Sequence, residues 1–202
     1  MTTFSEVRDV MSTAIEDLSR ETRDVFDILV LPNWGSPERR GYGRLLYGVV
    51  MNTFALTDRL STLRTGRIDR QTVRLKESLE MMGADPRAAG VAVQLWRHTL
   101  MHTGMPAVLV DRATEDRYHW LLHWGEPHLP KSHHMTLTSH PDGYVLNFGA
   151  LFAVDALSWL SASFFAAAEG DSEREASVVM SHDRLTKAQT VSVGYLSSSD
   201  GS

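Results

Sequence analysis

Apolar residues recur every three to four positions through the first half of the chain, the spacing typical of amphipathic helices. The pattern predicts four helices, over about 4–31, 37–66, 69–82 and 86–103. Asp69 is the expected N-cap of the third helix and Asp85 that of the fourth, where Pro86 follows at the first helical position. Gly104 and Pro106 should end the fourth helix, since proline cannot continue it.

The pattern then changes to short β-prone runs separated by turn-forming residues. The expected strands lie near 107–110, 118–122, 135–138 and 144–146, and they predict a small antiparallel sheet or a pair of hairpins. Helical spacing returns over about 149–169 and more weakly over 172–187. We therefore expect a mainly α (α+β) fold, with residues 1–188 as one helical domain, a β insertion at about 107–148, and a flexible tail at 189–202.

Length and composition narrow the class of protein. A chain of 202 residues without cysteine can bury a core without staples, has no thiol chemistry, and suits a reducing cytosol. Its first residues are charged and lack a continuous apolar segment, so we expect no signal peptide and a cytoplasmic location. The apolar stretch 148–168 carries Asp155, which is costly in lipid, so it predicts a buried core or interface helix and no membrane contact.

Charge gives a first candidate surface. A net charge of −5 argues against broad adhesion to nucleic acid, whose phosphates favour a basic surface. The densest basic stretch nevertheless lies where the second predicted helix meets the third, and nearby acidic residues also allow it to be a solvated corner. The candidate RNA-contacting residues in this stretch are Arg64, Arg67, Arg70 and Arg74.

A possible catalytic pair lies near the end of the fourth predicted helix, where four residues separate Arg97 from His102. Histidine can take a proton from an RNA 2′-hydroxyl or give one to the leaving oxygen, while arginine can hold the phosphate, so no metal is needed. The spacing alone is not specific, because chance supplies similar pairs such as Arg112/His119 and Arg117/His123. The setting of Arg97 and His102 on a capped, apolar helix distinguishes them.

Helix geometry limits this pair within one chain. Five residues on an ideal α-helix turn the side-chain direction by roughly 140°. Arg97 and His102 therefore share a face only if the arginine wraps round or the last turn unwinds. A second subunit that brought its own copy opposite would make such a site easier to build.

The same helix resembles the Arg-polar-x(n)-His signature of the HEPN superfamily over the run Leu95-Trp96-Arg97-His98-Thr99-Leu100-Met101-His102-Thr103-Gly104-Met105-Pro106. It is particularly similar to bacterial HEPN-like proteins that read Arg, a small or polar residue, and Gly-Leu-x-His before an apolar, proline-containing stretch. Thr99 stands where those proteins have glycine. The resemblance extends loosely to Asp58 and to Leu146-Asn147-Phe148, and so covers about residues 36–168.

The resemblance implies a HEPN-like helical bundle. The small antiparallel region that the pattern predicts would be an insertion between the fourth and fifth helices, outside the core architecture of the family. Active members are metal-independent endoribonucleases whose motifs pair across a homodimer, and many act as toxins or in antiviral defence. By this resemblance Arg97 and His102 are catalytic, with His98 at the polar position. The resemblance implies three partners: a second copy of the chain, RNA, and an antitoxin or defence protein. It implies no cofactor and no metal ion.

Two alternatives remain open. Many members of the family are inactive, so the chain could be a HEPN-like binding or regulatory module. It could also be a histidine-ligated metal protein, because eight of the nine histidines lie between residues 98 and 140. They include the pairs His98/His102 and His119/His123, but no complete metal-binding motif is present. Four tryptophans could stack on nucleobases, but core packing is favoured: Trp96, Trp120, Trp124 and Trp159.

Overall fold

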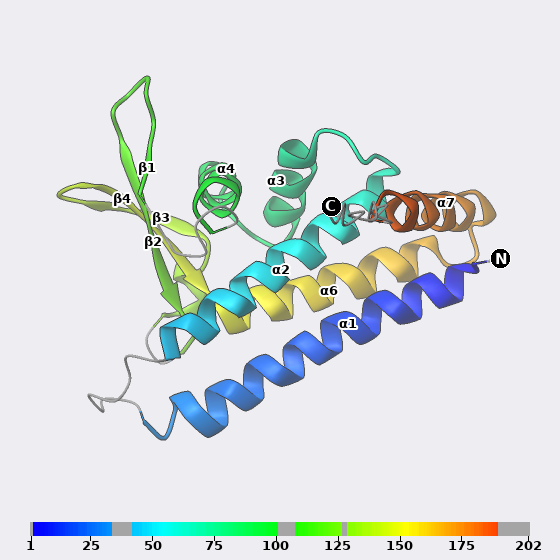
Figure 1. Ribbon diagram of the computed structural model, residues 1–202, viewed down its shortest axis with the longest axis horizontal. Coiled ribbons are helices and arrows are strands. Elements are labelled where there is room, and N and C mark those ends of the chain that lie inside the picture. Colours follow the sequence, from blue (N-terminus) through cyan, green and yellow to red (C-terminus); the bar gives the residue numbers. More distant parts are fainter. Residues whose placement is uncertain (1, 34–41, 101–107, 127–128, 190–202) are drawn as a thin grey trace, which may run out of the picture.

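The computed structural model describes residues 2–33, 42–100, 108–126 and 129–189. The described chain is mainly helical and carries a four-stranded sheet at one end (Figure 1). Three long helices, α1 (Phe4–Asp24), α2 (Tyr42–Thr65) and α6 (Ala150–Ala168), lie side by side. Helix α7 (Ser172–Gln189) packs on them at the end away from the sheet. The predicted mainly helical class is thus confirmed.

Helix α1 follows the predicted pattern closely. Thr3 and Glu6 form a reciprocal capping box at its start, so two N–H groups that the helix leaves unpaired gain acceptors. The residues buried along its inner face are Val7, Met11, Ile15, Leu18 and Thr22. Beyond Asp24 the chain continues as a π-helical segment, Val25–Val30, so the predicted helix is present with a changed hydrogen-bonding pattern in its last turns.

The starts of the next two helices differ in how well the sequence predicted them. Helix α4 (Pro86–Leu95) begins as expected, since the Asp85 side chain accepts from the N–H groups of Arg87 and Ala88. Helix α3 (Gln71–Met81) has Arg70 as its N-cap residue, so the prediction that Asp69 caps it is wrong. The expected end of the fourth helix at about 103 lies outside the described residues.

The sheet departs from the predicted arrangement in one respect. Its strands are β1 (Leu109–Val110), β2 (Arg117–His123), β3 (Thr136–His140) and β4 (Gly143–Gly149), in the order β1-β2-β4-β3. Both predicted hairpins are present and antiparallel, but the central strands β2 and β4 run parallel, so the sheet is mixed and the prediction of an antiparallel sheet is wrong. Turn residues specify each hairpin locally, whereas the contact between hairpins depends on the core that β2 and β4 share.

The main core lies where α2, α3 and α4 meet the sheet. Phe54 of α2 stacks on Trp96 with ring centroids 5.5 Å apart and meets Trp120 edge-on at 6.0 Å. Trp96 and Trp124 are buried and Trp120 is partly buried, so core packing is the correct interpretation for these three. Trp159 differs, because 61% of its surface is exposed on α6.

Helix α6 packs against both α1 and α2 and buries eight of its residues. By length and composition it is also the one helix in the described part of the chain that could cross a membrane. The tail at 190–202 lies outside the described residues, so its expected flexibility stays a prediction.

Candidate functional site

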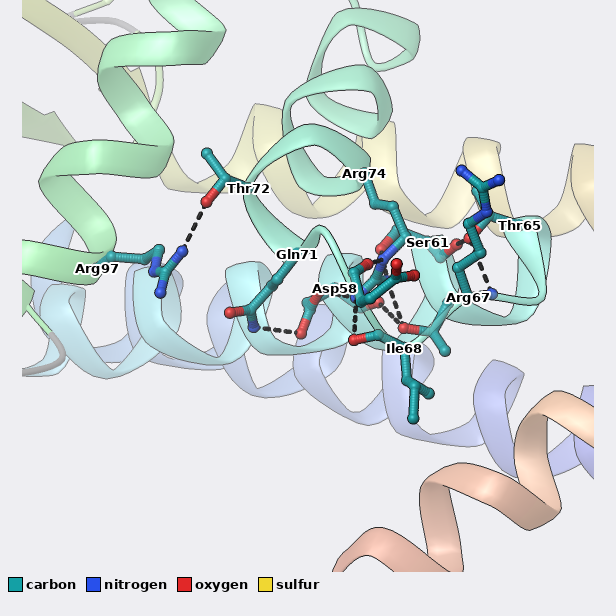
Figure 2. A network of polar contacts seen from close by, with 11 residues as sticks. Asp58, Ser61, Thr65, Arg67, Ile68, Gln71, Thr72, Arg74 and Arg97 are labelled. Carbon is teal, nitrogen blue, oxygen red and sulfur yellow. Dashed lines mark hydrogen bonds and ion pairs between the residues drawn. The ribbon is translucent and has the colours of Figure 1, made fainter.

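Arg97 lies on a π-helical turn, Trp96–Leu100, that continues α4. The buried ring of Trp96 anchors the beginning of this turn in the core, while Arg97 and His98 are exposed. The Nη1 atom of Arg97 donates to Oγ1 of Thr72 over 2.6 Å, as Figure 2 shows. The guanidinium is therefore held at the surface beside the first turn of α3.

The π-helical turn is itself relevant to the predicted pair. Single π turns inside α-helices occur often at functional sites. Their hydrogen bonds join residues five apart, which is the separation of Arg97 and His102 in the sequence. The turn is described as far as Leu100, and His102 lies outside the described residues.

Arg67 and Arg70 lie in the short connection between α2 and α3. Both are exposed, and no described residue gives either side chain a hydrogen bond or ion pair. They line a concavity of about 440 Å³, together with Thr65, Val73, Arg74 and Glu77. We call this concavity the α2–α3 pocket.

Arg64, near the end of α2, is intermediate in exposure between the buried Arg74 and the exposed Arg67 and Arg70. Its Nη2 atom lies 3.4 Å from the carboxylate of Glu77, and its side chain is 23% exposed. This ion pair spans α2 and α3, so Arg64 contributes to their packing and still reaches solvent. It lines a separate cavity of about 260 Å³ between α2, α6 and α7.

Arg74 does not have the role that the sequence suggested. It is 4% exposed, and its guanidinium donates to the hydroxyls of Ser61 and Thr62 and to the carbonyls of Ile68 and Asp69. With nearly every donor engaged inside the protein, it has little capacity to hold an RNA phosphate. The structure therefore removes Arg74 from the predicted set of RNA contacts and assigns it to the packing of α3 on α2.

Asp58 completes this buried network (Figure 2). Its carboxylate lies 3.6 Å from Nη2 of Arg74 and accepts from Nε2 of Gln71 over 2.6 Å. The sequence pointed to Asp58 through the resemblance and as an acidic residue beside the basic stretch, and it gave no role to Ser61 or Gln71. The available signal was Ser61-Thr62 on the apolar face of a predicted helix, because small polar residues there often receive a buried donor.

The other histidines give little support to a metal centre. Among the described residues no three side chains of His, Asp or Glu lie close enough together to hold a metal ion. His119 and His140 have ring centroids 6.4 Å apart, without a third ligand. His134 is partly buried, and its Nδ1 accepts from the N–H of Gly149 over 3.0 Å, so it serves the packing of the sheet.

The arrangement as a whole can bind anions. Three exposed arginines, Arg67, Arg70 and Arg97, lie around the first turn of α3, where the positive end of the helix dipole also favours negative charge. Arginine suits phosphate because its planar fork of donors matches two phosphate oxygens. Comparison of the chain with protein-family models, with curated proteins and with solved structures gives no match.

Proposed function

We propose that the protein is a HEPN-like, metal-independent endoribonuclease that acts as a homodimer. The observation that carries the proposal is the placement of Arg97, an exposed arginine on a π-helical turn that Thr72 holds beside the start of α3. An arginine fixed in this way keeps its other donors for a phosphate. Its sequence neighbours supply the histidines that such chemistry requires, His98 and His102.

In the proposed reaction Arg97 binds the scissile phosphate and offsets the negative charge that develops there. His102 acts as the general base or acid: one histidine takes the proton of the RNA 2′-hydroxyl, whose oxygen attacks phosphorus, and a protonated histidine donates to the departing 5′-oxygen. The products are a 2′,3′-cyclic phosphate and a free 5′-hydroxyl. A dimer would supply two histidines of this kind, one from each copy.

The cellular setting is part of the same proposal. We place the protein in the cytoplasm, in a toxin–antitoxin or antiviral defence system, with an antitoxin or defence protein as its partner. The main alternative is a catalytically inactive HEPN-like module that binds RNA or a partner. The exposed Arg67 and Arg70 favour that alternative specifically, because binding through them requires no histidine.

The test uses the purified full chain, a fluorescently labelled single-stranded RNA, and EDTA throughout. We expect cleavage without metal, and a loss of about 10²-fold or more on His102→Ala. Arg97→Ala should also lower the rate. Arg97→Lys should lower it less, because lysine keeps the positive charge but lacks the planar pair of donors that matches two phosphate oxygens.

His133→Ala is the matched control, since His133 is an exposed histidine far along the chain from Arg97. Its rate should equal that of the wild type. RNA left intact by the wild type would reject the ribonuclease and favour the binding module. Cleavage that survives His102→Ala would reject the assigned role of His102.

A further inference from the structure

We propose that the α2–α3 pocket is a phosphate-binding subsite for single-stranded RNA, in which Arg67 and Arg70 bind a backbone phosphate of the same strand whose scissile phosphate Arg97 holds. The choice of RNA as the ligand rests on the proposed function. The pocket measures about 440 Å³, which is within the range of small-ligand sites and accommodates a phosphate with part of its attached sugar.

The charges around the pocket leave two arginines uncompensated. Arg74 is paired with Asp58, and Glu77 is paired with Arg64. No described side chain pairs with Arg67 or Arg70, which are both exposed at the rim. An incoming phosphate would therefore meet two guanidinium groups without displacing an existing ion pair.

The buried Arg74 holds the backbone that carries these two arginines. It donates from Nε to the carbonyl of Asp69 over 2.7 Å and from Nη2 to that of Ile68 over 3.3 Å. Both carbonyls lie between Arg67 and Arg70 in the chain. Arg74 is thus a positioning residue, and the fixed connection reduces the entropy that binding would otherwise cost.

The start of α3 adds to the attraction. Arg70 adopts a left-handed conformation with φ 53° and gives α3 no side-chain cap. The N–H groups of Val73 and Arg74 donate to the carbonyl of Arg70. Those of Gln71 and Thr72 have no acceptor among the described residues and are left for a ligand, at the positive end of an 11-residue helix. A phosphate held by Arg70 lies at this end of the helix.

The pocket and Arg97 lie on opposite flanks of α3. Arg97 contacts Thr72, only two residues after Arg70, and Figure 2 shows Arg97 and Arg67 at the two ends of the polar network. The two sites are thus separated by at least the width of one helix, roughly 10 Å. One extended RNA strand can therefore contact both, so the pocket would hold the backbone while Arg97 engages the scissile phosphate.

The experiment measures binding of a short, fluorescein-labelled 2′-O-methyl RNA strand to the full chain by anisotropy. This strand lacks the attacking hydroxyl, so cleavage cannot disturb the measurement. Arg67→Gln combined with Arg70→Gln should weaken binding about tenfold or more. The slope of the logarithm of the binding constant against the logarithm of the salt concentration should fall by the equivalent of about one to two phosphate contacts. The matched control is Arg112→Gln with Arg117→Gln, which removes the same charge from exposed arginines of the β1–β2 hairpin and should change affinity little.

Equal weakening by the two double variants would show that only net charge matters, and would overturn the proposal. So would an unchanged affinity in the Arg67/Arg70 variant. A competition experiment compares inorganic phosphate with potassium chloride at equal ionic strength. If phosphate displaces the strand from the wild type better than the chloride does, and this difference disappears in the Arg67/Arg70 variant, the pocket binds free phosphate instead of RNA.

The two proposals fail separately. A wild type that binds through Arg67 and Arg70 but leaves cleavable RNA intact rejects the ribonuclease and supports the pocket. A wild type that cleaves RNA through His102, with a KM that the Arg67/Arg70 variant does not change, supports the ribonuclease and rejects the pocket.

Discussion

At the scale of single residues, arginines from one stretch of sequence have opposite roles. Arg67 and Arg70 are exposed, whereas Arg74 is 4% exposed. The difference arises because Arg74 is on the face of α3 that packs against α2, where Asp58, Ser61 and Thr62 supply acceptors. A charged residue is buried only where such partners exist.

This burial predicts a large effect of Arg74→Ala on stability. The substitution would leave the Asp58 carboxylate without its cation and two carbonyls without donors, and we expect a loss of about 3 kcal/mol in the free energy of unfolding. Urea denaturation measures it, with the exposed Arg67→Ala as a control that should stay within about 0.5 kcal/mol of the wild type. Equal stability of the two variants would contradict the structural role of Arg74.

At the scale of elements, His134 joins the hairpin of β3 and β4 to helix α6. It lies just before β3, accepts from the N–H of Gly149 at the end of β4, and packs edge-on against Phe148 and Phe152. Burial, with a smaller effect from the charge of Lys131, lowers the pKa of His134 to about 4. The junction therefore needs a neutral histidine, because a protonated Nδ1 could not accept from Gly149.

The protein should lose stability as the pH falls from 6.5 to 4. In this window the unfolded chain binds a proton at His134 and the folded protein does not. Over the whole window this difference lowers the free energy of unfolding by about 3 kcal/mol. Above pH 6.5 this contribution to pH dependence is absent. Urea denaturation of His134→Asn across the window should show a smaller pH dependence, while His133→Asn at the exposed neighbouring site should keep it. An unchanged pH dependence in His134→Asn would contradict the assignment.

At the scale of the whole molecule, the sheet and the candidate anion-binding residues occupy different parts of the structure. The sheet packs against α4 at one end of the molecule (Figure 1), while Arg67, Arg70 and Arg97 lie around the start of α3 (Figure 2). A single copy thus presents one anion-binding edge. In the proposed chemistry one His102 acts as the base and a second His102 as the acid, and a second copy of the chain would bring the latter.

We therefore predict a homodimer with twice the 22.6 kDa mass of the chain. Light scattering coupled to size exclusion measures the mass, and RNA cleavage measured across a dilution series tests whether activity requires the dimer. We expect the rate per chain to fall once dilution separates the copies. A monomer with undiminished cleavage would contradict the shared site.

The sequence by itself determined the features that depend on neighbours along the chain. Periodic apolar residues predicted the helices, Asp85 predicted the start of α4, and alternating β-prone runs located the strands, because hydrogen bonds and side-chain faces within an element involve residues a few positions apart. The basic stretch and the Arg97 motif were also visible as candidates.

Only the tertiary structure decided which of those candidates reach solvent and which lie together. The contact between Arg97 and Thr72 joins residues 25 apart, and the pair of Arg74 with Asp58 joins α3 to α2. The parallel pairing of β2 with β4 likewise depends on how two hairpins share one core. Each of these is set by packing between elements, and the same residue types at the same spacing would allow other arrangements.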